Sequence, residues 1–233
     1  MSTAKRIQAI VFDLDDTLYA ERDYVRSGYH AVARHLRERL GRSDPFEDWL
    51  WARFLAGRSA GAFDALSAEF GLALTADRIA DLVTVYRNHR PDIQPRGGAP
   101  ELLERLRKRY PLGLLSDGFL PAQQLKLEAL GLEGAFDAVV FTEAMGRDCW
   151  KPSPAGYLAV GERLGVAPDR CAYVADNAAK DFLAANELGW RTVRLRCEGQ
   201  VHADKLPPPG GGAHVTVGDL AEIEPALGLR AGQ

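Results

Sequence analysis

Short apolar runs separated by longer amphipathic stretches dominate the chain. The first run, Ile10-Val11-Phe12, has the length and branching of a strand that is buried on both faces of a sheet. Four later runs have the same character, at residues 112–115, 138–141, 171–175 and 192–195. Each of these four follows a stretch in which apolar residues recur at helical spacing. Alternation of helices with buried strands predicts an α/β fold with a doubly wound parallel sheet and right-handed crossovers.

Residues 20–92 interrupt this alternation. Apolar residues recur there at helical spacing throughout, and stop signals such as Gly41 and Gly71 divide the stretch into four predicted helices. The proline- and glycine-rich segment 91–98 then closes it. We therefore predict two units, a core from residues 1–19 and 93–233 and a helical module from residues 20–92 inserted after the first strand.

The C-terminal part carries weaker patterns. Residues 207–212 consist of three prolines and three glycines and predict a surface loop. Val215-Thr216-Val217 predicts a short extended element, and we expect the residues after it to form a frayed tail.

Composition and charge narrow the function classes. Hydrophobic residues make up 46% of the chain and charged residues 26%, which is ordinary for a globular protein. The net charge of −3 gives no sign of a nucleic-acid or membrane partner, and no apolar stretch is long enough for a membrane span. Cys149, Cys171 and Cys197 form no paired spacing, which favours a reducing compartment and a cytoplasmic location.

Carboxylates gather at the predicted end of the first strand. Asp13 and Asp15 follow Phe12, and strand alternation turns their side chains the same way. Two like charges side by side repel, so such a pair is costly unless a cation lies between them. By itself, the pair also fits an ordinary acidic turn in which Asp16 caps the next element.

Polar residues also follow the other predicted strands. Ser116-Asp117-Gly118, Thr142-Glu143 and Asp176 stand at three of these ends. The carboxyl ends of parallel strands share one edge of the sheet, where ligands bind in open α/β sheets. Because each end brings a different chemical type, we predict one shared site rather than unrelated turns.

These residue types suit Mg²⁺-dependent chemistry on a phosphate. Asp13 can attack phosphorus when a metal suppresses the repulsion between charges, and Asp15 can protonate the leaving oxygen and later activate water. Carboxylate and carbonyl oxygens are the ligands that Mg²⁺ prefers. The predicted metal ligands are Asp13, the backbone carbonyl of Asp15, and Asp176. The predicted phosphate-binding groups are the Ser116 hydroxyl, main-chain N–H groups near Asp117, and Lys151.

Four motifs, in this order and spacing, resemble those of the haloacid dehalogenase (HAD) superfamily of phosphohydrolases. They are Asp13-Leu14-Asp15-Asp16-Thr17, Ser116-Asp117-Gly118, Lys151-Pro152 and Asp176-Asn177-Ala178-Ala179-Lys180-Asp181. The resemblance spans residues 7 to about 196 and implies a Rossmann-like core, with a helical type-1 cap at residues 20–92. It also implies that Asp13 is phosphorylated and that Asp15 is the acid/base. It further implies that Ser116 and Lys151 hold the phosphoryl group and that Asp176 binds Mg²⁺.

The chain departs from the family pattern at two positions. Ala175 stands where glycine often precedes the fourth-motif aspartate, and Asp117 stands where asparagine is frequent. Asp181 either binds the metal, directly or through water, or orders its loop. We expect a small phosphorylated metabolite, a sugar phosphate or a nucleotide, as substrate. The candidates for selecting it are Tyr19, Arg22 and Arg26.

Three alternatives remain open at this point. Hydrolytic dehalogenases of the superfamily lack the second acid of the first motif, so the presence of Asp15 disfavours that activity. Phosphoglucomutase-like transfer uses the same catalytic set and differs mainly in the cap. A non-catalytic binding protein on the same fold is disfavoured because the acids and Lys151 are intact.

Overall fold

The computed structural model describes residues 6–229 and contains a six-stranded sheet in the order β3-β2-β1-β4-β5-β6. Every neighbouring pair is parallel, so the predicted doubly wound sheet is confirmed. The strands are β1 (Ala9–Phe12), β2 (Leu112–Ser116), β3 (Ala138–Phe141), β4 (Cys171–Ala175), β5 (Arg191–Leu195) and β6 (Val215–Val217). The outer ends of the predicted core, residues 1–5 and 230–233, lie outside the described residues.

Helices cover both faces of the sheet. The helices packed on one face are α5 (Ala99–Arg107), α6 (Ala122–Ala129) and α9 (Ile223–Ala226). Those on the other face are α7 (Ala155–Leu164) and α8 (Leu183–Glu187). Short 3₁₀ turns are η1 (Glu133–Ala135), η2 (Thr142–Met145), η3 (Arg147–Cys149), η4 (Pro168–Arg170) and η5 (Leu220–Glu222).

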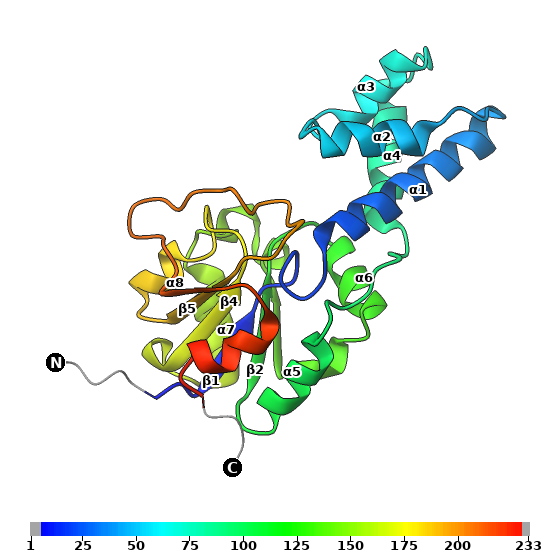
Figure 1. Ribbon diagram of the computed structural model, residues 1–233. Helices are drawn as coiled ribbons and strands as arrows, with labels where there is room; N and C mark the ends of the chain where they lie inside the picture. The colour runs from blue at the N-terminus through cyan, green and yellow to red at the C-terminus, as the bar shows by residue number, and fades with distance from the viewer. Residues whose placement is uncertain (1–5, 230–233) are drawn as a thin grey trace.

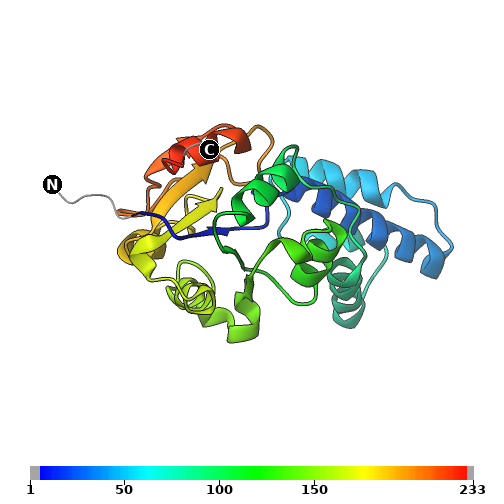
Figure 2. The ribbon, with the colours of Figure 1, turned by 90° about the horizontal axis from the view of Figure 1, so that it is seen from below.

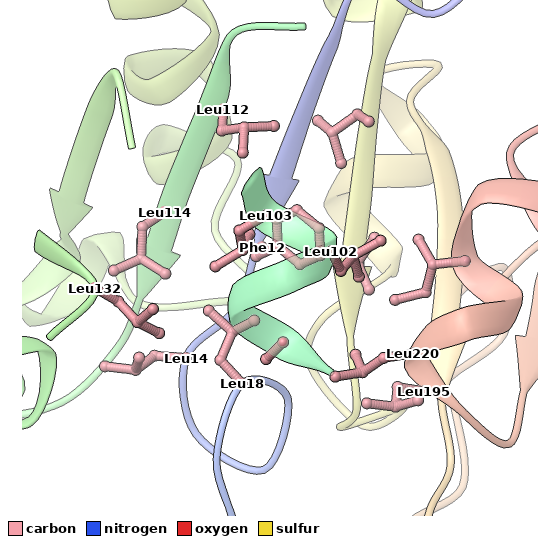
Figure 3. Close-up of a cluster of buried hydrophobic side chains, with 14 of the residues drawn as sticks. Phe12, Leu14, Leu18, Leu102, Leu103, Leu112, Leu114, Leu132, Leu195 and Leu220 are labelled. Carbon is pink, nitrogen blue, oxygen red and sulfur yellow. The ribbon is translucent and has the colours of Figure 1, made fainter. Parts of the chain in front are cut away.

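Strand β1 lies in the middle of the sheet, paired with β2 and β4, and has no exposed residue. Its side chains alternate between the two layers. Phe12 packs with Leu102 and Leu103 of α5 on one face (Figure 3), whereas Val11 joins the cluster on the face of α7. Because both faces are covered, every position of β1 is apolar, and this explains why the run was recognisable in the sequence.

Four helices follow β1 and stand apart from the sheet, at one end of the molecule (Figures 1 and 2). They are α1 (Glu21–Leu40), α2 (Phe46–Leu55), α3 (Ala62–Glu69) and α4 (Ala76–Asn88). Hereafter we call residues 20–92 the insert. Apolar side chains of its helices form a cluster of their own, separate from the two clusters beside the sheet. No helix within residues 6–229 is both long and apolar enough to cross a membrane.

The chain enters and leaves the insert at neighbouring points. Tyr19 forms an isolated antiparallel bridge with Pro95, and the Arg96 N–H donates to the Leu18 carbonyl at 2.7 Å. The carboxylate of Asp16 accepts hydrogen bonds from the N–H of Glu21 at 2.9 Å and of Val201 at 2.6 Å. Both connections are therefore fixed to the core at one place.

Two predictions for the second half of the chain were wrong. The predicted helix 178–188 begins only at Leu183, because the carboxylate of Asp181 accepts the N–H of Asn177 at 2.8 Å in a competing turn. The expected frayed tail instead forms η5 and α9, whose Ile223 is fully buried against the sheet. Residues 230–233 of that predicted tail lie outside the described part of the chain.

Candidate active site

The end of β1 places Asp13 in the centre of the sheet edge. Its N–H donates to the Val174 carbonyl at 2.9 Å, which continues the pairing with β4 by one residue. The Lys151 ammonium, fully buried, lies 2.5 Å from Asp13 Oδ1 and 2.8 Å from Asp181 Oδ1. Although burial opposes it, the charges of these two carboxylates raise the pKa of Lys151 well above its usual value. Lys151 is therefore a permanent cation beside Asp13.

Three acidic side chains share this buried space. Burial raises the pKa of Asp13 to about 7, with Lys151 acting against the rise. Burial, followed by the charges of Asp181 and Asp13, raises the pKa of Asp176 to about 9. Asp176 Oδ2 is buried without a hydrogen-bond partner among residues 6–229. Lys151 pairs with Asp13 and Asp181, whereas this oxygen of Asp176 keeps no partner in the described part of the chain, and such an oxygen fits a hard cation.

Asp15 points toward a different set of partners. Its carboxylate accepts hydrogen bonds from Lys126 Nζ at 2.6 Å, from Gln123 Nε2 at 2.7 Å, and from the Tyr19 hydroxyl. Burial alone would raise the pKa of Asp15, but the Lys126 charge and these hydrogen bonds hold it below its ordinary value. Tyr19, a predicted specificity residue, is fully buried and serves this network.

Gln123 and Lys126 were missed by sequence reasoning. Both lie on α6 and are buried, at 1% and 6% exposure. Their i, i+3 spacing puts them on one face of that helix, directly after the Ser116-Asp117-Gly118 motif. Polar side chains on the otherwise apolar face of a helix next to a motif are the signal that could have found them.

Ser116 and Asp117 lie at the end of β2. Gln123 Nε2 donates to Ser116 Oγ at 2.6 Å. The Asp117 carboxylate accepts from the Thr142 hydroxyl at 2.8 Å and from Lys180 Nζ at 3.0 Å. Burial acts to raise the pKa of Asp117, but Lys151 and Lys180 outweigh it, so the pKa is lowered. The extra negative charge at this position is thus matched by a lysine of the fourth motif.

A cavity of about 580 Å³ opens above these side chains. Asp13, Asp15 and Asp176 line it from the core, and residues of all four insert helices line it from the other side. Arg22 and Arg26 are not among its lining residues within the described chain. Their guanidinium groups lie over the Trp51 ring, at 5.6 Å and 5.5 Å from its centroid. The structure therefore does not bring these two arginines to the site.

Comparison with known proteins identifies one family, in which the similar proteins include phosphatases and an (S)-2-haloacid dehalogenase from Xanthobacter autotrophicus. The family of haloacid dehalogenase-like hydrolases matches residues 7–189. The chain is 29% identical to glyceraldehyde 3-phosphate phosphatase from Methanopyrus kandleri, covering 82% of this chain and 84% of that protein. It is 28% identical to phosphoserine phosphatase from Thermus thermophilus, with 93% and 98% covered. Among solved structures, the HAD-hydrolase YfnB from Bacillus subtilis superposes with a TM-score of 0.69 at 21% identity, covering 97% and 100% of the two chains. The chain belongs to the haloacid dehalogenase-like hydrolase family.

Proposed function

We propose that this hydrolase is a Mg²⁺-dependent phosphatase that cleaves small phosphomonoesters through a phosphorylated Asp13. The observation that carries the proposal is the pairing of Asp13 with the buried Lys151 ammonium at 2.5 Å, with the hydrogen-bonded Asp15 lining the same cavity. The names of similar phosphatases support the reaction class, and their substrates, glyceraldehyde 3-phosphate and phosphoserine, are small phosphorylated metabolites.

In the first step, an Asp13 carboxylate oxygen attacks the phosphorus and the bond to the leaving oxygen breaks. Lys151 neutralises charge on the phosphoryl oxygens, with the Ser116 hydroxyl and main-chain N–H groups near Asp117 as further donors. Asp15 gives its proton to the leaving oxygen. A phosphate dianion beside Asp15 raises the proton affinity of that carboxylate, which allows it to act as an acid despite its hydrogen bonds.

In the second step, Asp15 is the base. It takes a proton from a water molecule whose oxygen attacks the phosphorus, and the bond between phosphorus and Asp13 breaks. Lys126, Gln123 and Tyr19 hold the carboxylate in its ionised form and fixed in direction. This network suits the base role.

The residues fit a bound Mg²⁺. Asp13, the backbone carbonyl of Asp15 and Asp176 would hold it, and the unpartnered Asp176 Oδ2 is the observation that supports this set. When bound, Mg²⁺ supplies charge that offsets the repulsion between the acids and a phosphate dianion. Asp181 contacts Lys151 at 2.8 Å and the N–H of Asn177 at 2.8 Å, so we assign it to positioning Lys151 and ordering the loop.

A simple assay tests this function. Purified protein should release phosphate from p-nitrophenyl phosphate with Mg²⁺, lose activity with EDTA and regain it when Mg²⁺ is restored. Asp13→Asn should remove turnover while the fold stays intact, and Asp204→Asn, at a side chain 99% exposed, is the matched control. Full activity of a folded Asp13→Asn protein would overturn the covalent mechanism.

The same protein samples decide between phosphatase and dehalogenase. A dehalogenase breaks a carbon–halogen bond, and its leaving halide needs no proton, so the three donors on Asp15 would have no function. We therefore expect no halide release from 2-chloropropionate. Halide release that persists in EDTA, without phosphate release from any ester, would favour the dehalogenase.

A further inference from the structure

We infer that the substrate carries a planar aromatic ring on the leaving-group side of the ester, as a nucleoside monophosphate does. This inference rests on the proposed phosphatase function and adds the chemical class of the ester. It follows from the wall of the cavity that the insert provides opposite Asp13.

That wall is aromatic and continuous. Tyr86 of α4 is its centre, and the rings of Tyr24, Tyr29 and Phe63 surround it at centroid distances of 5.5, 5.8 and 6.1 Å. All four side chains line the cavity, together with Phe54. The contributing residues come from every helix of the insert, so the surface depends on the insert fold as a whole.

Gly28 leaves the space that the Tyr86 ring occupies. A Cβ atom on Gly28, in the interior of α1, would lie 2.4 Å from Tyr86 Cε2, far inside van der Waals contact. Glycine weakens a helix interior, but here it lets the tyrosine ring lie directly against the backbone of α1. The ring position is therefore a specific feature of the packing of α1 against α4.

The core side of the cavity offers less aromatic surface to a ligand. The guanidinium of Arg87 lies 3.4 Å from the centroid of the Phe119 ring, and that of Arg147 lies 4.6 Å from it. Phe119 is covered by these cations. Trp150, the other core aromatic that lines the cavity, packs edge-on against Phe119 at a centroid distance of 5.5 Å. Most of the aromatic surface left for a substrate therefore belongs to the insert.

A short polar leaving group would fit this wall poorly. Its hydroxyl and carbonyl groups need hydrogen-bond partners, and polar groups left without partners in an apolar site weaken binding. The cavity, at about 580 Å³, lies within the range of roughly 300–1,000 Å³ for small-molecule sites and has room for a base and a ribose. Stacking of one planar base on aromatic side chains is worth about tenfold or more in affinity. Ser59 and Asp64, which also line the cavity, can hydrogen-bond to the ring edge.

Two pairs of substrates with matched leaving oxygens test this inference. Uridine 5′-monophosphate and ribose 5-phosphate share a primary alcohol and differ in the base, and benzyl phosphate and n-propyl phosphate differ in an aryl ring. We expect kcat/KM to be about tenfold or more higher for the aromatic member. A gain in both pairs supports any planar ring, and a gain only in the first supports a nucleoside.

The failing outcomes are distinguishable. Equal kcat/KM within both pairs, with p-nitrophenyl phosphate hydrolysed in Mg²⁺, overturns the aromatic inference and leaves the phosphatase function in place. No hydrolysis of any ester, p-nitrophenyl phosphate included, overturns both.

A matched pair of variants locates the effect. Phe63→Leu removes an aromatic ring from the wall. Phe70→Leu removes a ring that packs against Phe46 and Trp49 and is not among the cavity-lining residues of the described chain. We expect Phe63→Leu to raise KM for uridine 5′-monophosphate about tenfold and to leave ribose 5-phosphate unchanged, with Phe70→Leu leaving the ratio of the two as in the wild type. Equal effects of Phe63→Leu on both substrates, in a protein with unchanged circular dichroism, would overturn the assignment of the wall.

Discussion

Asp15 accepts hydrogen bonds from Tyr19, Gln123 and Lys126, and these three donors fix the direction of its carboxylate. Of the three donors, only Lys126 carries a charge. It lies 2.6 Å from Asp15 Oδ1 and 4.0 Å from the centroid of the Tyr24 ring, so it also connects the core to the first helix of the insert. Its main effect is to keep Asp15 ionised.

Lys126→Met should lower kcat about 10- to 100-fold. Without the ammonium, the pKa of Asp15 rises. The acid limb of kcat against pH should then move to higher pH, because Asp15 must be ionised to act as the base of the second step. Lys126→Arg should return the acid limb close to its wild-type pH. Lys108→Met, at a side chain 66% exposed, should leave the pH profile unchanged. An acid limb that stays in place in Lys126→Met would contradict this role.

Asp15→Asn should separate the two steps of the reaction. p-Nitrophenolate leaves without a proton, so Asp13 can still be phosphorylated from p-nitrophenyl phosphate. The water then lacks its base, and the phosphorylated protein should accumulate. Intact-mass spectrometry after substrate addition should show the mass of one added phosphoryl group. Absence of the adduct in a folded, inactive Asp15→Asn protein would count against a base role in the second step.

The strands and helices differ in how well the sequence predicted them. The strands were recognisable because apolar runs such as Ile10-Val11-Phe12 are buried on both faces. Helix α8 starts later than its pattern indicates, because the side chains of Asn177 and Asp181 bond to nearby backbone N–H groups and hold a turn. The spacing of apolar residues does not reveal such side-chain hydrogen bonds, which compete with the helix for backbone N–H groups.

The residues of the candidate site also differ in how well the sequence predicted their positions. Asp13 could be placed from the end of a strand and Lys151 from the Lys151-Pro152 motif. Lys126 lies 111 positions from Asp15 and meets it only through the packing of α6. Arg22 was expected near the substrate from its position after β1. Its guanidinium instead finds the Trp51 ring, a partner that the sequence did not indicate.

Helix α9 is small but belongs to the core. Leu220, Ile223 and Leu227 are buried beside α5, and Arg105 of α5 donates to Glu224 at 2.9 Å. Ile223→Ala should lower the free energy of unfolding by about 2–5 kcal/mol, because it leaves a cavity in a fully buried place. Urea titration measures the loss, and Leu206→Ala, at 83% exposure, should change stability by less than about 0.5 kcal/mol. If Ile223→Ala lowered the free energy of unfolding by less than about 0.5 kcal/mol, α9 would not contribute to the core and would behave as a tail.

For the whole molecule, the buried acids should make stability depend on pH and, through the proposed Mg²⁺ site, on metal. Burial raises the pKa of Asp13 to about 7, of Glu21 to about 8 and of Asp176 to about 9, from ordinary values of 3.8, 4.5 and 3.8. A carboxyl group with a raised folded-state pKa contributes stability that is present at low pH. That contribution is lost as the pH rises toward the folded-state value.

The metal-free protein should therefore lose stability between about pH 5 and pH 9. Mg²⁺ should raise Tm, and by more at pH 8 than at pH 5, because binding to the ionised acids stabilises the folded state. Asp176→Asn should be more stable than wild type in EDTA at pH 8 and should respond little to Mg²⁺. Scanning calorimetry with and without EDTA measures both effects. A Tm that rises from pH 5 to pH 9 in EDTA would refute the linkage.

The central place of β1 in the sheet has a consequence for biosynthesis. β1 is the first strand to be made, yet its neighbour Cys171 in β4 leaves the ribosome much later, after about 10–30 s at typical rates of translation. Until β4 is made, β1 lacks one of its two partner strands, whereas the insert, with an apolar cluster of its own, has all of its helices before β2 is made. The growing chain thus holds the whole insert before it holds β4, so the sheet around β1 is completed only after the insert is already present.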